Sequence, residues 1–219
     1  VRIRVEILKR ESDGRAKYEL FQRLNSGGAE LSPQESRNCV ATMLNADLFE
    51  KLLRMADYPP FRDSISLTPR AIEEQKHVEL VLRFLAFRYK KYQSTIDVHD
   101  WLDEILIDIS QDPHFDIDGE RIIFEQTFQL LVSLLGNNTF KRFDGAFGGS
   151  FSIAAFEAIT HGVSSNLPKV TPQEKHEILV ARIQAMWTEF DFIDSTKAGT
   201  RGSTRLGKLL PFAKAWFDI

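Results

Sequence analysis

The sequence contains a single cysteine and no long run of apolar residues. One cysteine excludes a disulfide-stabilised fold and a cysteine-rich zinc site, and it is typical of a protein from a reducing compartment. The apolar runs fall short of the roughly 20 residues that a membrane-spanning helix needs. No secretory signal pattern is present. We therefore expect a cytoplasmic protein with no membrane partner.

The sequence also lacks a large excess of either charge. Its 28 basic residues nearly balance its 31 acidic ones, and the net charge is −3. This balance excludes a globally basic nucleic-acid coat protein, so any contact with DNA or RNA must come from a local basic patch. Proline and glycine are sparse, at 8 and 12 of 219 residues, and apolar residues make up 43%. Such a composition excludes a disordered or fibrous chain and is sufficient for a sizeable core.

Helical patterns fill almost all of the chain after residue 31, so we expect a mainly α fold. Capping boxes, apolar stripes at helical spacing and terminal glycines mark the segments. The first expected helix begins at the capping box 32–35, and the second runs from 69 to about 92. Apolar stripes predict two more over 98–109 and 124–135, the latter closed by Gly136, and a fifth helix is expected over 151–161, closed by Gly162. Another begins at the capping box 171–174, and the last runs from about 203 to the end. In the first of them, Cys39 is expected to face inward with Val40 and Met43.

The first seven residues depart from the helical pattern. From Val1 to Ile7 apolar and polar residues alternate with period two, which predicts a half-buried β-strand. A lone strand cannot satisfy its backbone hydrogen bonds. Residues 189–193 are the one other candidate for an extended segment in the sequence. The glycine-rich stretch 145–150 is expected to be a loop. Because the sequence does not begin with Met, we expect a fragment or one piece of a split protein, whose sheet lies upstream or in another chain.

A specific motif spans the end of this region and the first expected helix. It reads F-x-R-L-N-x-G-G from Phe21 to Gly28 and continues as L-S-x-x-E-x-R-N from Leu31 to Asn38. The motif resembles the N-terminal family of GmrSD-type restriction endonucleases, bacterial proteins in which a ParB/sulfiredoxin-like fold precedes a helical region. Weaker resemblance continues through residues 81–86, 140–143 and 199–205. It implies that residues 1–31 are the C-terminal remnant of a mostly missing ParB-like α+β domain and that residues 32–219 are a helical domain.

The resemblance also implies a role in defence against foreign DNA, with nucleotide hydrolysis or DNA cleavage performed by the complete proteins. The implied partners are the missing ParB-like portion, in the same or a separate chain, DNA, and a second copy of the chain. An NTP and Mg²⁺ are the cofactors implied for the complete protein, and none is assigned to this chain. The family's Asp-Gly-Gln-Gln-Arg motif and its His-Asn-His nuclease module are absent from this sequence, so no catalytic residue is assigned and enzymatic activity is left open.

Two groups of residues are candidates for contact with phosphate. The first is the helix–loop–helix corner of the motif, where free backbone N–H groups between two arginines can face an anion; the alternative is a tight corner whose arginines are solvated or pair with Glu30 or Glu35. The second is the segment 196–214, which has five basic residues, no acidic one, and glycine and hydroxyl residues just before a helix; the alternative is a solvated basic turn. The candidate phosphate-, nucleotide- or DNA-binding residues are Arg23, Asn25, Gly27, Gly28, Arg37, Asn38, Arg201, Ser203 and Arg205.

Two other patterns match known ligand loops in part. Residues 202–208 have P-loop spacing, but Leu209 stands where a Ser or Thr must bind magnesium. Residues 114–125 have EF-hand spacing, but a histidine replaces the first aspartate. The interpretation we prefer for this second stretch is a turn in which Asp118 caps a helix.

Three functions follow from these observations. The first is the helical portion of a GmrSD-like bacterial defence protein, which completes a nucleotide or DNA phosphate site and mediates assembly. The second is a non-catalytic helical interaction or dimerisation module. The third is an HD-like metal phosphohydrolase that uses His77, His99 and Asp100, although acidic residues beside Trp101 are more simply the solvated face of a helix.

Overall fold

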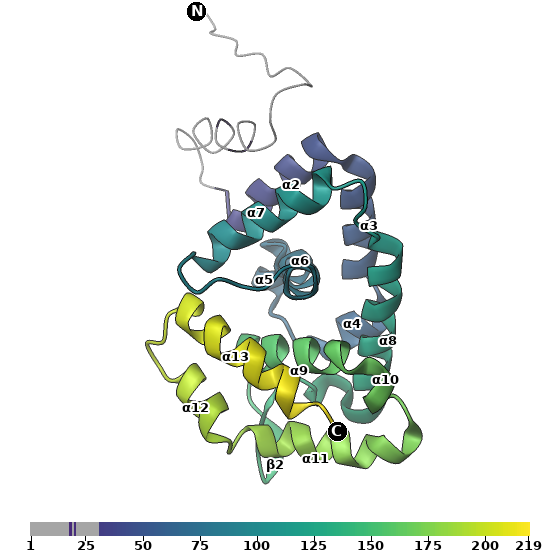
Figure 1. Ribbon diagram of the computed structural model, residues 1–219, viewed down its shortest axis with the longest axis vertical. Coiled ribbons are helices and arrows are strands. Elements are labelled where there is room, and N and C mark those ends of the chain that lie inside the picture. Colours follow the sequence, from purple (N-terminus) through teal and green to yellow (C-terminus); the bar gives the residue numbers. More distant parts are fainter. Residues whose placement is uncertain (1–17, 19, 21–30) are drawn as a thin grey trace, which may run out of the picture.

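A computed structural model describes Tyr18, Leu20 and residues 31–219, and its described part is mainly α-helical, as predicted (Figure 1). The predicted strand Val1–Ile7 lies outside the described residues. The helices are α2 (Pro33–Leu44), α3 (Ala46–Ala56), α4 (Pro59–Ser64), α5 (Pro69–Glu73), α6 (Lys76–Tyr89), α7 (Val98–Gln111), α8 (Ile117–Leu135), α9 (Ile153–Ser165), α10 (Leu167–Val170), α11 (His176–Met186), α12 (Phe190–Thr196) and α13 (Gly202–Trp216). Two 3₁₀ turns, η1 (Gly136–Asn138) and η2 (Gln173–Lys175), and two short strands, β1 (Arg142–Asp144) and β2 (Ala146–Gly148), complete the described elements. No helix in the described part is both long and apolar enough to cross a bilayer.

Helix α6 lies at the centre of the fold. Figure 1 shows it viewed along its axis, with the other long helices arranged around it. Every residue from 77 to 87 is buried, which is the pattern of a helix enclosed on all sides. Two of these buried residues, Glu79 and Arg83, are charged, so the centre of the molecule must also supply partners for their charges.

Phenylalanine rings fill the space between α4, α6, α8 and α9. Phe124 and Phe128, one turn apart on α8, have ring centroids 4.5 Å apart, and both contact Phe61 and Phe84. Their edge-to-face and tilted geometries are those that aromatic pairs prefer. This cluster explains why the aromatic stripe predicted on 124–135 faces inward.

Two predicted helix ends are confirmed. Ser32 caps α2 in a full capping box, in which its hydroxyl accepts from the Glu35 N–H and the Glu35 carboxylate accepts from the Ser32 N–H. Gly136 ends α8 with a φ of +55°, a value that favours glycine.

Several helix boundaries differ from the prediction. The helix expected over 69–92 is broken between α5 and α6 at Gln75, whose φ is +59°. The capping box expected at 171–174 does not form, because the Thr171 hydroxyl donates to the Leu167 carbonyl, and α11 begins only after η2. Helix α8 is capped by Asp116, which accepts from the Gly119 N–H, so the expectation that Asp118 is the cap is wrong.

The strand predictions for the described part are wrong. Residues 142–148, of which the latter part was expected to be loop, form an antiparallel hairpin with Phe143 opposite Phe147 and a turn at Gly145, which has a φ of +72°. Residues 189–193, the weak extended candidate, belong mostly to helix α12. The alternation of polar and aromatic residues there reflects a short helix whose Phe192 is buried while Phe190 is exposed.

Gly162 does not end its helix as predicted, because α9 continues to Ser165. The glycine instead allows α9 and α13 to approach closely. A Cβ atom at this position would lie 2.3 Å from the Phe217 ring and 2.6 Å from the Ala213 carbonyl oxygen. The absence of a side chain is therefore required by packing between helices rather than by the end of one.

The face that α2 buries is partly polar. Gln34, Ser36 and Arg37 are buried on it beside Val40 and Ala41, whereas Cys39 is exposed and Met43 is 43% exposed. The inward position predicted for Val40 is therefore confirmed, and those predicted for Cys39 and Met43 are wrong. The helix is rotated toward partners for the Arg37 guanidinium, and these partners form the centre of the site described next.

Candidate functional site

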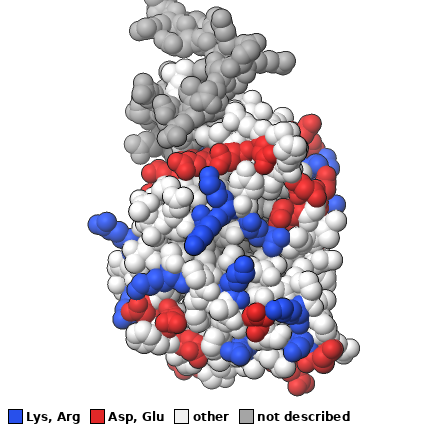
Figure 2. All heavy atoms as spheres, viewed as in Figure 1, with Lys and Arg blue, Asp and Glu red and all other residues white. Residues whose placement is uncertain are grey.

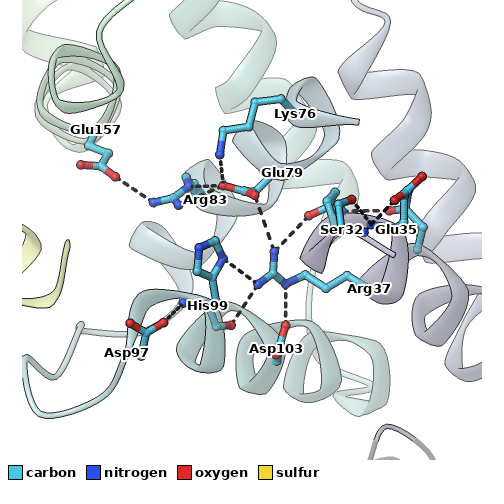
Figure 3. Close-up of polar contacts among 12 residues, drawn as sticks. Ser32, Glu35, Arg37, Lys76, Glu79, Arg83, Asp97, His99, Asp103 and Glu157 are labelled. Carbon is cyan, nitrogen blue, oxygen red and sulfur yellow. Dashed lines mark hydrogen bonds and ion pairs between the residues drawn. The ribbon is translucent and has the colours of Figure 1, made fainter. Parts of the chain in front are cut away.

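The Arg37 guanidinium is completely enclosed between α2, α6 and α7 (Figure 3). Its Nε donates to Asp103 at 2.5 Å, and its Nη2 donates to the His99 carbonyl at 3.1 Å and lies 3.2 Å from the His99 ring nitrogen Nδ1. Its Nη1 reaches Gln34 at 3.4 Å and Glu79 at 3.7 Å. One side chain thus links α2 to both α6 and α7.

Charges continue from Arg37 through the centre of the molecule. Glu79 on α6 accepts from Lys76 at 2.6 Å and from Arg83 at 2.9 Å. Arg83 also donates to Glu157 on α9 at 2.8 Å, and Glu157 has no exposed surface. We call this series the buried ion chain; its members, in order of contact and alternating in sign, are Asp103, Arg37, Glu79, Arg83, Glu157 and Arg205.

The pKa values of two carboxyl groups in the buried ion chain are shifted in opposite directions. Burial alone would raise the pKa of Glu79, but Arg83, Lys76 and Arg37 lower it from 4.5 to about 2. At Asp103, burial is the larger effect and raises the pKa in spite of the bond to Arg37. Glu79 is therefore the carboxylate whose charge the chain stabilises most clearly.

We expect the contribution of Glu79 to be lost in acid. Because its pKa is about 2 in the folded protein and 4.5 in the unfolded chain, the stabilisation is fully present above about pH 4.5 and disappears as the pH falls toward 2. In urea titrations at several pH values, the difference in unfolding free energy between wild type and Glu79→Gln should shrink by about 3 kcal/mol over this interval. The exposed variant Glu50→Gln is the control, and an equal pH dependence in both variants would contradict the prediction.

The last member of the buried ion chain, Arg205, lines an open cleft of about 760 Å³ between the β1–β2 hairpin, the start of α9, and the α12–α13 region. Three cations line the cleft, from Arg142, Lys197 and Arg205, of which Lys197 also pairs with Asp194 at 2.8 Å and Arg205 with Glu157. None of the described residues that line it is Asp or Glu. Ser150, Ser152 and Thr200 line it as well, together with Ser195 and Thr196, whose hydroxyl groups donate to the Phe192 carbonyl. We call this region the basic cleft.

The first turn of α9 opens into the basic cleft at Ile153 and Ala154. Ser152 caps this helix through the Ala155 N–H, at 3.2 Å. The backbone N–H groups of the first turn have no partner within the helix, and they lie at the positive end of its dipole. They add donors to the same region that Arg142 makes positive.

Arg205 serves the basic cleft and the buried ion chain at the same time. Its Nε and Nη2 donate to Glu157 at 2.8 and 3.1 Å. Its Nη1 makes no hydrogen bond with any residue in the described part, and the side chain is 18% exposed. Glu157 therefore fixes the guanidinium while one of its nitrogens stays available to a ligand.

The residues predicted to contact phosphate are only partly brought together. Arg23, Asn25, Gly27 and Gly28 lie outside the described residues. Arg205 lines the basic cleft, whereas Arg201 is exposed just before α13 and Ser203 lies half-buried in the first turn of that helix.

The two candidates on α2 lie within the protein framework rather than in the basic cleft. Arg37 has no exposed surface and does not pair with Glu35, which caps α2, while Glu30 lies outside the described residues. Asn38 is half-buried and accepts from Gln34 at 2.8 Å. Arg37 is therefore a positioning residue in this structure, and it reaches the cleft only through the buried ion chain.

The sequence analysis did not identify Glu79, Arg83, Glu157 or Arg142. A signal was present for two of them, because a Glu and an Arg four residues apart in an otherwise apolar helix indicate a buried pair. Glu157 interrupts an apolar run in the same way. Arg142 could not have been recognised, since only the hairpin brings it to the cleft.

The metal and phosphate-loop patterns find no support in the described residues. No group of three or more His, Cys, Asp or Glu side chains that could hold a metal occurs among them. His77 is buried at the start of α6, while His99 lies on α7 beside Arg37. The stretch with EF-hand spacing is mostly helix α8, and the stretch with P-loop spacing is the start of α13.

Comparisons of the chain with protein-family models, with curated proteins and with solved structures found no match. The function must therefore be inferred from the chemistry of the cleft.

Proposed function

We propose that the basic cleft binds the phosphate backbone of a nucleic acid, and that the chain is the helical portion of a GmrSD-like bacterial defence protein. The observation that carries the proposal is the composition of the cleft, in which three cations, three serine and threonine residues that do not bond Phe192 and the start of α9 meet without a carboxylate among its described residues. Cations, hydroxyl groups and backbone N–H groups at helix starts are the usual donors to phosphate oxygens.

The buried ion chain supports a link between this cleft and the motif that carries the family resemblance. Arg37 belongs to that motif and Arg205 belongs to the cleft, and three side chains, each in contact with the next, join them. In the proposed role, the motif end of the chain faces the portion of the protein that precedes the helices. The cleft end supplies contacts to the phosphates.

The cleft is tested by removing two of its cations while leaving the buried ion chain intact. Arg142→Gln with Lys197→Gln should weaken binding of a fluorescent DNA duplex or single strand about tenfold or more at roughly 0.1 M salt. The slope of log affinity against log salt should fall by about 2, since each lost phosphate contact removes about one released counterion. Fluorescence anisotropy over a salt titration measures both quantities.

The matched control is Arg70→Gln with Lys169→Gln, which removes one arginine and one lysine that are exposed and paired with acids elsewhere on the surface. Arg205 is not a suitable test residue, because its removal leaves Glu157 without one of its two cationic partners. Equal weakening by the control pair, or unchanged binding in the cleft pair, would contradict the proposal. If the wild-type protein binds neither DNA probe, a non-catalytic interaction module becomes the favoured function.

A further inference from the structure

A second, smaller cavity of about 390 Å³ lies between the C-terminal end of α6, α9 and α13. Its rim carries four cations, Arg88, Lys90, Lys91 and Lys214, and none of the described residues that line it is acidic. Figure 2 shows Lys and Arg side chains gathered on this face of the molecule, below the band of acidic residues over α7. We call this cavity the His161 pocket, after the imidazole that lines it.

Only half of the rim is neutralised by neighbouring carboxylates. Arg88 donates to Glu120 at 2.5 and 3.2 Å, and Lys90 donates to Asp108 at 3.1 Å. Lys91 and Lys214 make no ion pair with any residue that the structure describes. Two unneutralised ammonium groups therefore face one small cavity, which gives it a positive potential.

The floor of the His161 pocket is apolar. Phe87, Leu206 and Leu210 lie there, and all three are buried. A cavity of a few hundred cubic ångströms with an apolar floor and a few charged groups has the form of a small-molecule site. The floor can accept the body of a ligand whose charge remains at the rim.

One ring nitrogen of His161, which lines the pocket, has no hydrogen-bond partner among the described residues. Its Nδ1 is buried and has no hydrogen-bond partner in the described part, while the ring edge packs against Phe87 with centroids 6.1 Å apart. Burial, together with Lys214 and Arg88, lowers the pKa of His161 from 6.5 to about 4. The pocket thus disfavours one more positive charge and favours a negative one.

We propose that the His161 pocket binds a small anion with an apolar body, of the chemical class of aromatic phosphate monoesters and carboxylates. The ammonium groups of Lys91 and Lys214 hold the anionic group, and Phe87 and the leucine side chains hold the body. This site is separate from the basic cleft and does not depend on the function proposed for it.

Phenyl phosphate is the probe, and inorganic phosphate and benzyl alcohol are its charged and apolar halves. Calorimetry should give a sub-millimolar dissociation constant for phenyl phosphate and binding at least about tenfold weaker for each half. The bound dianion should also raise the pKa of His161 above about 4. NMR spectra of the histidine ring signals, recorded over a pH titration, measure this pKa. The signals of His161 are identified as those that disappear in His161→Gln.

Lys91→Gln with Lys214→Gln should weaken phenyl phosphate binding about tenfold or more. Lys141→Gln with Lys175→Gln is the matched control, because neither of these lysines has a carboxylate partner in the described part and neither lines the pocket. The cleft variant Arg142→Gln with Lys197→Gln should bind phenyl phosphate as the wild type does, so failure of one proposal is distinguishable from failure of the other. Binding of inorganic phosphate or benzyl alcohol as tight as that of phenyl phosphate, or an unmoved His161 signal, would overturn the inference.

Discussion

Glu157→Gln should lower the free energy of unfolding by about 3 kcal/mol, because the substitution removes the carboxylate charge that Arg83 and Arg205 share. Glu157 has no exposed surface, so water cannot replace the lost carboxylate. Arg83 keeps Glu79, but Glu79 already serves Lys76 and Arg37. The size and shape of the side chain are preserved in this variant, so the effect reports on charge rather than on packing.

Urea denaturation followed by circular dichroism measures the loss. The control is Glu50→Gln, which removes one partner of an exposed pair with Arg54 and should cost less than about 1 kcal/mol. A loss in Glu157→Gln no larger than in this control would show that the buried ion chain contributes little to folding. The same variant should also loosen Arg205, so its DNA affinity is a second measurement at the basic cleft.

Gly162→Ala should destabilise the protein by about 3 kcal/mol, the upper end of the range for an added methyl group in a packed interior. The new Cβ would lie 2.6 Å from the Ala213 carbonyl oxygen, which belongs to the backbone and cannot turn aside. Helices α9 and α13 would have to separate. In an exposed helix the same substitution is stabilising by up to about 1 kcal/mol, so the sign of the effect is decisive.

Thermal unfolding measures this effect, and Gly148→Ala is its control. A Cβ at Gly148 meets no atom within 4 Å, and its backbone has no positive φ that would strain an alanine. The control should therefore change the midpoint of unfolding little. A stabilised Gly162→Ala protein would mean that α9 and α13 are not packed as closely as the structure has them.

The helical character of the chain was predictable because its signals are local. The Ser32 capping box and the helix end at Gly136 each depend on residues within one turn, and both were correctly identified. Gly162 was interpreted by the same local rule, but its role depends on Ala213 and Phe217, about fifty residues further along the chain. A pattern confined to one helix cannot show which second helix it meets.

The site was less predictable for a related reason. The rule that apolar residues face inward placed Met43 and Cys39 in the core, whereas α2 turns Arg37 inward to meet acids on α6 and α7. Arg205 was recognised from the basic composition of its segment. Its fixed orientation, which depends on Glu157, and the neighbouring Arg142 on the hairpin became visible only in three dimensions.

The alternation of sign along the buried ion chain restricts how these positions can diverge in evolution. A change of charge at Glu79 or Glu157 removes one counter-charge from the arginine on each side, so an isolated replacement should be eliminated by selection. Homologous sequences are therefore expected to vary at the six positions in compensating pairs, or to replace the whole series by apolar residues at once. Correlated substitution between α2, α6, α7, α9 and α13 would be the trace of this packing in an alignment.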